Sequence, residues 1–591
     1  MEESRHNQKF NGARPQISVV MPTFKQEAFI TRALESLVAQ TIKAWELIII
    51  NDGSPDETEQ KIDPFLKDKR IRYFAVPHNL GLGRVLNLGL SEAKGELVAY
   101  LPSDDVYYPE HLHSLCDLLR DNPQAILAFS GVQHHGEKES AGQIQGYPLQ
   151  LVQVMHCACA RMWTGRNELV TDDLGVMFWN KIADLGQFLG TGQITCKWVD
   201  HLYQRHKIIR EPIGGINPYR VYYEVREPLR FKSSTGNLFD EVKLYSNERN
   251  RPNTPAAPDG LKILLLGELG KNADRILALE EAGHKLYGLW TANPCGYNTI
   301  GPLPFGHVED LDREKYPEQI KEIKPDVIYG LLNWPAVPIV HEVVKNNPGI
   351  PFVWHFKESP FECMKNGTWD MLFDLYTSAD GLIYTNPETK NWLATVLPKT
   401  ALNKPDFILD GDLPKKFWFT KNVSPKLSDG SEESHVVILE AYDLYKHAVD
   451  ELAERKIQLH YLNNIDCSNW VGELSKYDAG WLNFRRSNNG GGITKVVRDD
   501  ISIPEHVYAF VAAGLPIIQY DNSDSVVATQ SLTKKHHLGI FAKDVKNLCQ
   551  KLHDRKLLSE ISRNSWDARE QFTFDFHAQK LTEFFRKVVR G

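Results

Sequence analysis

The sequence predicts an α/β protein in which parallel sheets form three domain-sized units. Short apolar runs alternate with amphipathic stretches along most of the chain, which is the pattern of repeated strand and helix. A stretch dense in Pro, Asn and charge, residues 246–260, interrupts this alternation. The length of 591 residues exceeds what a single hydrophobic core supports, so we expect several cores.

Composition and charge exclude several classes of protein. With 42% apolar and 24% charged residues, the chain is typical of folded globular proteins rather than disordered ones. A formal net charge of −8 argues against a broad basic surface, so nucleic acid is not an expected partner. No apolar run approaches the roughly 20 residues of a membrane-spanning helix, although peripheral membrane contact stays open. The polar N-terminus lacks the pattern of a secretory signal and there is no CxxC pair among eight cysteines, so we predict a cytoplasmic protein.

The first unit, residues 1–245, begins with four strand-like runs. They read ISVVMPTF, WELIIINDGS, IRYFAVPHN and ELVAYLPSDD, and each ends in turn-forming residues. Between the first two, residues 27–40 carry apolar side chains at spacings of three and four, which predicts a helix with one buried face. Because the carboxyl ends of parallel strands meet at one edge, we expect a ligand-binding cleft there.

Asp104 and Asp105 follow the fourth run directly. Paired carboxylates at a strand end suit Mg²⁺ or Mn²⁺, which complete their coordination with substrate phosphates. The alternative is a solvated turn in which the two acids only end the strand. If the two acids bind a metal ion, the predicted ligand is a nucleotide diphosphate together with a divalent cation.

Two long segments carry a family resemblance. They are SVVMPTFKQEAFITRALESLVAQTIKAWELIIINDGSPD and HNLGLGRVLNLGLSEAKGELVAYLPSDD, and in this order they resemble family 2 glycosyltransferases of the GT-A fold, over roughly residues 15–230. The resemblance implies a nucleobase cradle at Pro22, Thr23 and Phe24, a base-binding carboxylate at Asp52, and ribose and metal binding by Asp104 and Asp105. Pro102 departs from the family, many members of which have a third acid there, and Asn51 replaces a frequent Asp.

The same resemblance assigns further residues. Arg84 would face the diphosphate, or else form a surface salt bridge. In TDDLGVMFWNKI the second acid, Asp173, would be the base that deprotonates the acceptor, with Asp172 in reserve, whereas the simpler reading is helix capping. His201 and His206 are candidates for a late metal ligand, and a structural role is the alternative for each. The implied reaction is a metal-dependent, inverting transfer from a nucleotide sugar, most commonly a UDP-sugar.

The second half contains two further α/β series, residues 261–425 and 426–591. They look like the paired Rossmann-type halves of a GT-B glycosyltransferase and are most similar to family 4. His355, in FVWHFKESP, stands where that family often has a histidine facing the donor, and packing between Trp354 and Phe356 is the competing explanation.

The second half also departs from that family. Ala509 replaces the expected second glutamate, and Glu505 is present but offset. The usual phosphate-binding Arg and Lys are not evident, since only Lys446 follows the HVVILEAY strand. Arg485 and Arg486, before the loop Gly490–Gly492, could cradle a phosphate instead, or belong to a surface loop. The second module is therefore a second transferase or a degenerate module that binds the acceptor.

The sequence as a whole predicts a glycosyltransferase that adds sugar to a glycan or a protein. Two modules that act in succession on one acceptor are a further possibility. The alternative from another class is a non-catalytic nucleotide-sugar-binding scaffold of a glycan assembly complex. The donor sugar, the nucleotide base, the acceptor and the oligomeric state do not follow from the sequence.

Overall fold

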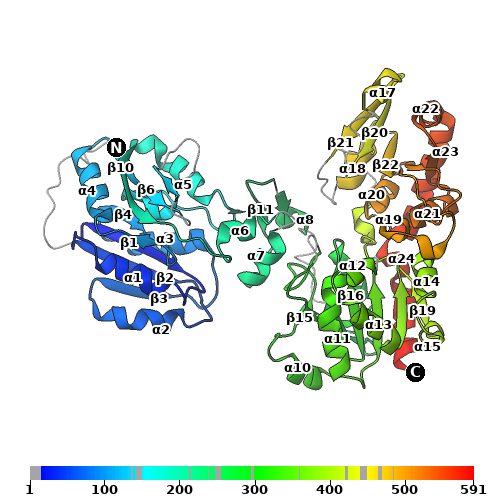
Figure 1. Cartoon of the computed structure of the whole chain (residues 1–591), viewed down its shortest axis with the longest axis horizontal. Coiled ribbons are helices and arrows are strands. Elements are labelled where there is room, and N and C mark those ends of the chain that lie inside the picture. Colours follow the sequence, from blue (N-terminus) through cyan, green and yellow to red (C-terminus); the bar gives the residue numbers. More distant parts are fainter. Residues whose placement is uncertain are drawn as a thin grey trace. The chain divides into compact units, whose positions relative to one another are not determined.

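The computed structural model places the chain in two compact units, Met1–Val242 and Lys243–Gly591 (Figure 1). The described residues are 15–134, 138–141, 149–211, 215–236, 238–245, 255–294, 298–358, 360–419, 423–439, 449–462, 469–483 and 485–591. Much of the predicted linker, residues 246–254, and Lys446 lie outside the described residues.

A nine-stranded sheet forms the centre of the first unit. Its order is β3-β2-β1-β4-β8-β6-β10-β5, with β7 paired to β6. The strands are β1 (Ile17–Thr23), β2 (Trp45–Asn51), β3 (Ile71–Ala75), β4 (Leu97–Tyr100), β5 (Val106–Tyr107), β6 (Ala125–Gln133), β7 (Glu139–Ser140), β8 (Val154–Cys157) and β10 (Gln187–Lys197). The four predicted strands β1 to β4 are parallel neighbours, but β8 lies antiparallel between β4 and β6, so the sheet is mixed.

Alternation along β1 divides the core of this unit into two layers. Ile17, Val19 and Met21 are buried in one cluster together with residues of α1 and α4, whereas Val20 is buried in another with residues of α3 and α5. Helices therefore cover both faces of the sheet, as expected when parallel strands are buried on both sides. The helices of this unit are α1 (Ile30–Val38), α2 (Thr58–Ile62), α3 (Leu82–Glu92), α4 (His111–Asp121), α5 (Leu174–Ile182), α6 (Arg205–Ile209), α7 (Ile216–Tyr222) and, at its boundary, α8 (Glu241–Leu244).

A small second sheet completes the first unit. It joins β9 (Val170–Thr171), β11 (Arg230–Lys232) and β12 (Leu238–Asp240) in the order β12-β11-β9. Because β9 ends immediately before Asp172, this sheet fixes the chain at the start of α5.

The second unit contains two parallel sheets. The seven-stranded sheet has the order β15-β14-β13-β16-β17-β18-β19, with strands β13 (Lys262–Gly267), β14 (Lys285–Trp290), β15 (Val308–Asp310), β16 (Val327–Leu332), β17 (Phe352–Phe356), β18 (Gly381–Tyr384) and β19 (Asp406–Ile408). The five-stranded sheet has the order β21-β20-β22-β23-β24, with β20 (Ser434–Ile438), β21 (Ile457–Tyr461), β22 (Ala479–Asn483), β23 (Ile517–Tyr520) and β24 (Gly539–Ala542).

Helices connect the strands of both sheets. They are α9 (Ile276–Glu281), α10 (Tyr316–Ile323), α11 (Val337–Asn346), α12 (Phe361–Lys365), α13 (Trp369–Ser378), α14 (Pro387–Leu393), α15 (Lys399–Leu402), α17 (Val449–Glu454), α18 (Trp470–Leu474), α19 (Arg498–Ile501), α20 (His506–Ala512), α21 (Ala528–Lys535), α22 (Val545–His553), α23 (Arg555–Ala568) and α24 (Phe574–Val589). The last helix, α24, returns to the seven-stranded sheet, where Phe585 meets Tyr329 with ring centroids 5.0 Å apart (Figure 1).

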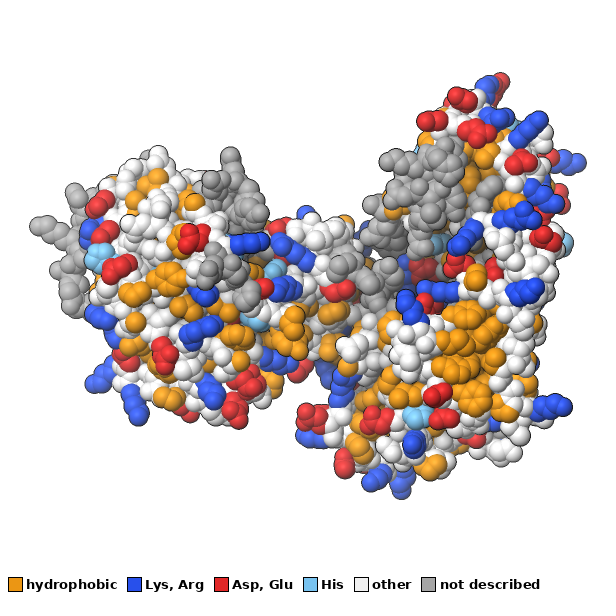
Figure 2. All heavy atoms as spheres, viewed as in Figure 1, with side chains coloured by type: hydrophobic (Ala, Val, Ile, Leu, Met, Phe, Trp, Pro, Cys, Tyr) orange, Lys and Arg blue, Asp and Glu red, His pale blue; other side chains and the backbone are white. Residues whose placement is uncertain are grey.

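Acidic and basic side chains are interspersed over the face of both units seen in Figure 2. Hydrophobic side chains gather on part of the second unit on the same face. Within the described residues, none of the helices combines the length and the apolar character needed to cross a membrane.

Candidate active site

The carboxyl ends of β1, β2 and β4 open into one cavity of ≈ 160 Å³ in the first unit. Five of the predicted donor-binding residues line it: Pro22, Thr23, Phe24, Asp52 and Asp104. The cavity therefore lies at the edge of the sheet where open α/β folds bind ligands. Its remaining wall includes side chains from the segment 203–223, which carries α6 and α7.

The end of β1 presents one polar atom and one aromatic ring to this cavity. The Thr23 hydroxyl is buried and has no hydrogen-bond partner among the described residues, so it is available to a ligand. The Phe24 ring stacks on Tyr223 at 5.4 Å and meets Tyr222 edge-on at 5.9 Å. These tyrosines were not predicted, because they reach the cavity by packing from about 200 residues further along the chain.

Asp52 organises the turn that begins α3. Its carboxylate accepts hydrogen bonds from the amides of Leu80 at 2.6 Å and Gly81 at 3.0 Å. Burial raises the pKa of Asp52 to about 6, although these two amide bonds oppose the rise. The buried Arg166 supports the same turn by donating to the side-chain and backbone oxygens of Asn79 at 2.6 and 2.8 Å. Arg166 is a further residue that sequence reasoning missed.

Two arginines near the site differ in their position relative to the cavity. Arg84 is exposed and is not among the residues that line the cavity. Arg205, at the start of α6, does line it, and it is the one Lys or Arg among the lining residues. His201 and His206 were predicted from the sequence as candidate metal ligands, whereas Arg205, which lies between them, was not predicted as a site residue.

Asp104 and Asp105 differ in their surroundings. Asp104 lines the cavity, and its carboxylate lies 3.0 Å from Nε2 of His201, whose ring stacks on Phe29 at 4.6 Å. Asp105 is buried and accepts a hydrogen bond from the Val199 amide at 2.9 Å. Burial, with Asp104 beside it, raises the pKa of Asp105 well above its ordinary value. Asp104 is therefore the acid that faces the cavity, and His201 contacts it without being among the lining residues.

Neither Asp105 nor His206 lines the cavity. The His206 ring packs against Trp198 at 5.5 Å, and burial, with Arg210 and Lys207 nearby, lowers its pKa to about 4. Among the described residues there is no group of three or more His, Cys, Asp or Glu side chains arranged to hold a metal ion. A cation held by Asp104 and the adjacent His201 would need its other ligands from water or substrate.

Asp172 and Asp173 have opposite environments at the start of α5. The buried carboxylate of Asp172 is paired with Arg210 and accepts hydrogen bonds from the amide and hydroxyl of Ser234 at 2.9 and 2.6 Å. Burial alone would raise the pKa of Asp172, but these bonds hold it below its ordinary value. Among the described residues, the half-buried Asp173 carboxylate has no hydrogen-bond or ion-pair partner. Asp173 is therefore the acid of the pair whose carboxylate is not engaged by the described residues, and neither acid is among the residues that line the cavity.

His355 of the second unit is fully buried in β17. Nε2 lies 3.0 Å from the Leu409 carbonyl and Nδ1 lies 2.7 Å from the Tyr329 hydroxyl. Since the carbonyl can only accept, Nε2 carries the proton and Nδ1 accepts from tyrosine. Burial lowers the pKa of His355 to about 3. Both nitrogens are satisfied within the fold, which favours the packing interpretation over contact with a donor.

The other candidates of the second unit lie in two places. Arg485 is exposed and pairs with Asp499 at 3.0 Å, and Arg486 is exposed beside it. Glu505, just before α20, pairs with Lys271 from the loop after β13. Desolvation would raise the pKa of Glu505, but Lys271 and His506 hold it below its ordinary value. Glu505 and Arg485 thus have different ion-pair partners, Lys271 and Asp499.

Comparison with known proteins gives a family match within the first unit. Residues 18–181 match the model of the family "Glycosyl transferase family 2". A protein described as an uncharacterized glycosyltransferase from Rickettsia felis is 33% identical over 129 residues, which cover 22% of this chain and 21% of that protein. Another from Haemophilus influenzae is 33% identical over 109 residues, which cover 18% and 44%. The two matches thus span less than half of the relatives' own length. They confirm the predicted family 2 resemblance for the N-terminal part and identify it as a glycosyltransferase domain.

Part of the chain is also similar to solved structures. Staphylococcus aureus TarS 1–349 in complex with UDP-GlcNAc is 17% identical, with a TM-score of 0.29, over 32% of this chain and 60% of that chain. The mannosyltransferase PcManGT from Pyrobaculum calidifontis, in complex with GDP-Man and Mn²⁺, is 15% identical, with a TM-score of 0.28, over 34% and 62%. The match to a family model ends at residue 181, so the GT-B-like pairing of the second unit stays a prediction.

Proposed function

We propose that the chain transfers a sugar from a nucleotide-diphosphate donor, a UDP-sugar in the first instance, to an acceptor hydroxyl in the cavity of the first unit. The observation that carries this proposal is that Thr23, Asp52 and Asp104, which belong to three different strand ends of the family-matched segment, line one cavity. Phe24 and the neighbouring tyrosines supply rings for a nucleobase, and Arg205 supplies positive charge for the diphosphate.

The residues present fit a divalent cation that arrives with its donor. Asp104 and His201 would hold it, and a cation with few protein ligands typically completes its shell with water and substrate phosphates. When bound, Mg²⁺ or Mn²⁺ would stabilise negative charge on the departing nucleotide diphosphate. Asp105 would support Asp104 from the buried side rather than serve as a ligand, because its carboxylate already accepts the Val199 amide.

The acceptor hydroxyl would be activated by Asp173. In a single displacement the acceptor oxygen forms a bond to C1 of the donor sugar while the bond from C1 to the phosphate oxygen breaks. The acceptor proton passes to the Asp173 carboxylate, and the electron pair leaves with the nucleotide diphosphate. One displacement inverts the anomeric configuration, and no carboxylate nucleophile is required.

Nucleotide release from a panel of UDP- and GDP-sugars, measured with Mn²⁺ and with EDTA, tests this proposal. We expect one donor to release nucleotide and Asp104→Asn to reduce release at least about 100-fold, whereas Asp121→Asn, an exposed acid of the same unit, leaves it unchanged. Arg205→Gln should raise the KM for the donor, and Arg84→Gln should not. Nucleotide binding without any transfer would favour the scaffold alternative instead.

A further inference from the structure

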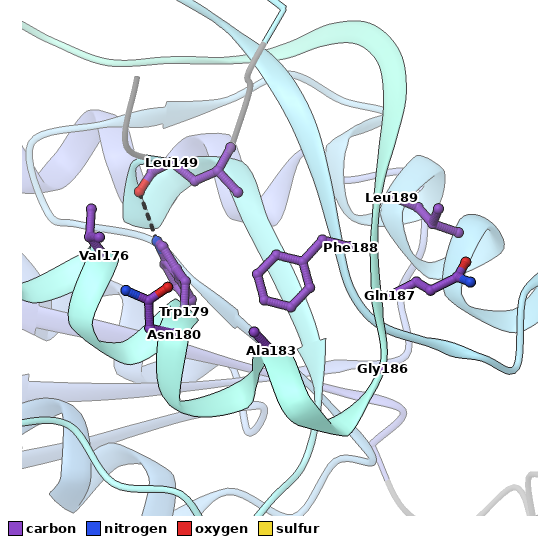
Figure 3. A pocket seen from close by; sticks show the side chains of 9 residues that line it. All are labelled: Leu149, Val176, Trp179, Asn180, Ala183, Gly186, Gln187, Phe188 and Leu189. Carbon is purple, nitrogen blue, oxygen red and sulfur yellow. Dashed lines mark hydrogen bonds between the residues drawn. The ribbon is translucent and has the colours of Figure 1, made fainter. Parts of the chain in front are cut away.

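A second and larger pocket of ≈ 440 Å³ lies on the first unit beside helix α5 (Figure 3). In Figure 3 the Phe188 ring lies between α5, which carries Val176, Trp179 and Asn180, and the chain that carries Gln187. The Trp179 indole is held in place by a hydrogen bond of 3.0 Å from Nε1 to the Leu149 carbonyl. The volume falls within the range of roughly 300–1,000 Å³ that is typical of small-ligand sites.

The described side chains around this pocket are uncharged. Among the described residues that line it, none has an ionisable side chain. The charged neighbours in the same stretch point to other partners: Lys181 donates to the Met162 carbonyl at 3.0 Å and to the Thr164 hydroxyl at 2.9 Å. Asp184 pairs with Arg161 at 2.8 Å. The pocket therefore suits a neutral ligand, because a charged one would lose hydration without finding a counter-charge.

Two features suit a sugar better than a hydrocarbon. The half-buried Phe188 offers an aromatic surface against which the C–H face of a sugar ring can pack. The carboxamides of Asn180 and Gln187 have no side-chain hydrogen bond among the described residues, and each can both donate to and accept from hydroxyl groups. A pocket for an alkyl chain would gain nothing from these amides.

Two chain segments connect the pocket with the donor cavity and with the proposed base. Leu149 lines the pocket and Leu151 lines the donor cavity, so their Cα atoms are at most about 7 Å apart. Helix α5 begins directly after Asp173, and Val176 and Asn180 follow that acid by three and seven residues. At 1.5 Å per residue, Val176 and Asn180 lie about 5 and 10 Å beyond the proposed base along the helix axis, and Ala183, at the end of the helix, lies about 15 Å beyond it.

We propose that this pocket binds a neutral sugar unit of the acceptor, so that the acceptor is a neutral oligosaccharide or polysaccharide chain whose terminal hydroxyl reaches Asp173. This inference rests on the proposed function, because it places the acceptor relative to the proposed base. It predicts that affinity for the acceptor depends on Phe188 and Asn180, whereas affinity for the donor does not.

The test uses the full chain, the donor that supports nucleotide release, and neutral tetrasaccharides of glucose, mannose, galactose and N-acetylglucosamine. We expect one tetrasaccharide to accelerate release, and Phe188→Ala and Asn180→Ala each to raise the KM for it by about tenfold. Donor KM and acceptor-independent release should stay unchanged. Phe188→Leu keeps an apolar side chain at this position, so it controls for misfolding. The matched control is Leu185→Ala, because Leu185 is nearby in the sequence, is 46% exposed and does not line the pocket.

Direct binding of the same tetrasaccharides, measured by saturation-transfer NMR on wild type and Phe188→Ala, gives a readout that is independent of turnover. Binding that is lost in the variant supports the proposal even when no transfer is detected, in which case only the proposed function fails. Absence of binding by all four tetrasaccharides overturns the proposal. Equal binding by wild type and variant, or acceleration only by charged or lipid acceptors, overturns it as well.

Discussion

At the scale of single residues, neighbours in the sequence have different chemistry because the fold engages one and leaves the other free. Asp172 is held by Arg210 and Ser234, whereas the adjacent Asp173 has no side-chain partner among the described residues. Asp104 faces the cavity, whereas the adjacent Asp105 is turned into the core toward the Val199 amide. In each pair, one acid stabilises the fold, and the other is the candidate for binding or catalysis.

Replacement of the two acids at α5 should separate these roles. We expect Asp173→Asn to lower the rate of transfer about 10²–10⁴-fold, the usual contribution of a general base, with thermal stability and donor affinity unchanged. Asp172→Asn removes a carboxylate that satisfies Arg210 and Ser234, so it should lower the free energy of unfolding by about 1–3 kcal/mol. Nucleotide release and thermal melting of both variants check this, and the reverse pattern would make Asp172 the base.

His355 should make the stability of the second unit depend on pH. In the unfolded chain its imidazole binds a proton near its ordinary pKa of about 6.5, but burial lowers the pKa to about 3 in the fold. Between these values the unfolded state binds more protons, so stability falls as pH is lowered, by roughly 1.4 kcal/mol per pH unit.

His355→Gln should remove this component. Melting of wild type and variant between pH 7 and pH 4 measures it, with the exposed His553→Gln as control. A functional role for His355 at a donor site would instead show as lost nucleotide release at neutral pH. Equal pH slopes for His355→Gln and wild type would contradict the assigned structural role.

At the scale of elements, helix α3 connects Asp52 to the wall of the cavity. Its first turn follows the loop that Asp52 and Arg166 hold, and Leu82 and Val85 line the cavity. Helix α3 also packs closely on the segment that precedes β9: a Cβ on Gly83 would lie 1.9 Å from the Thr164 carbonyl oxygen. Glycine at this position therefore allows the helix and the Thr164 backbone to approach each other.

Gly83→Ala should be destabilising even though alanine favours helix by about 1 kcal/mol. The added methyl would collide with backbone rather than with a flexible side chain, so the start of α3 must shift, and we expect a loss of about 1–3 kcal/mol in the free energy of unfolding. Donor affinity should fall as well. Leu88→Ala, which truncates a 39% exposed side chain on the same helix, is the control. A variant as stable as wild type would mean that α3 accommodates the methyl group without moving.

The elements also show how far sequence reasoning reaches in this protein. The residues at the ends of β1, β2 and β4 line one cavity, and the sequence allows this to be expected because an apolar run followed by a turn places them at one edge of a parallel sheet. Arg166 and the tyrosines around residue 222 were missed, because their positions depend on packing between distant segments. Arg166 reaches Asn79 across 87 positions of the chain. The antiparallel strand β8 was missed since its short run, Val154–Cys157, does not reveal the direction in which it pairs.

At the scale of the whole molecule, each unit encloses hydrophobic cores of its own. The clusters around β1 and β4 contain only residues of the first unit, and those around β17 and β20 contain only residues of the second. Such units can unfold in separate transitions, and a ligand stabilises only the unit that binds it. The number of thermal transitions and their response to donor therefore report where the donor binds.

We expect differential scanning calorimetry of the full chain to show more than one transition. A UDP-sugar present at 100 times its Kd should stabilise the transition of the first unit by about 2.7 kcal/mol and leave the others in place. Gly83→Ala should lower the transition that the donor raises, and His355→Gln should act on a different one. If the donor instead raises the temperature of the transition that His355→Gln affects, nucleotide-sugar binding lies in the second unit. That result would assign the transferase role to the second module rather than to the cavity at Asp52 and Asp104.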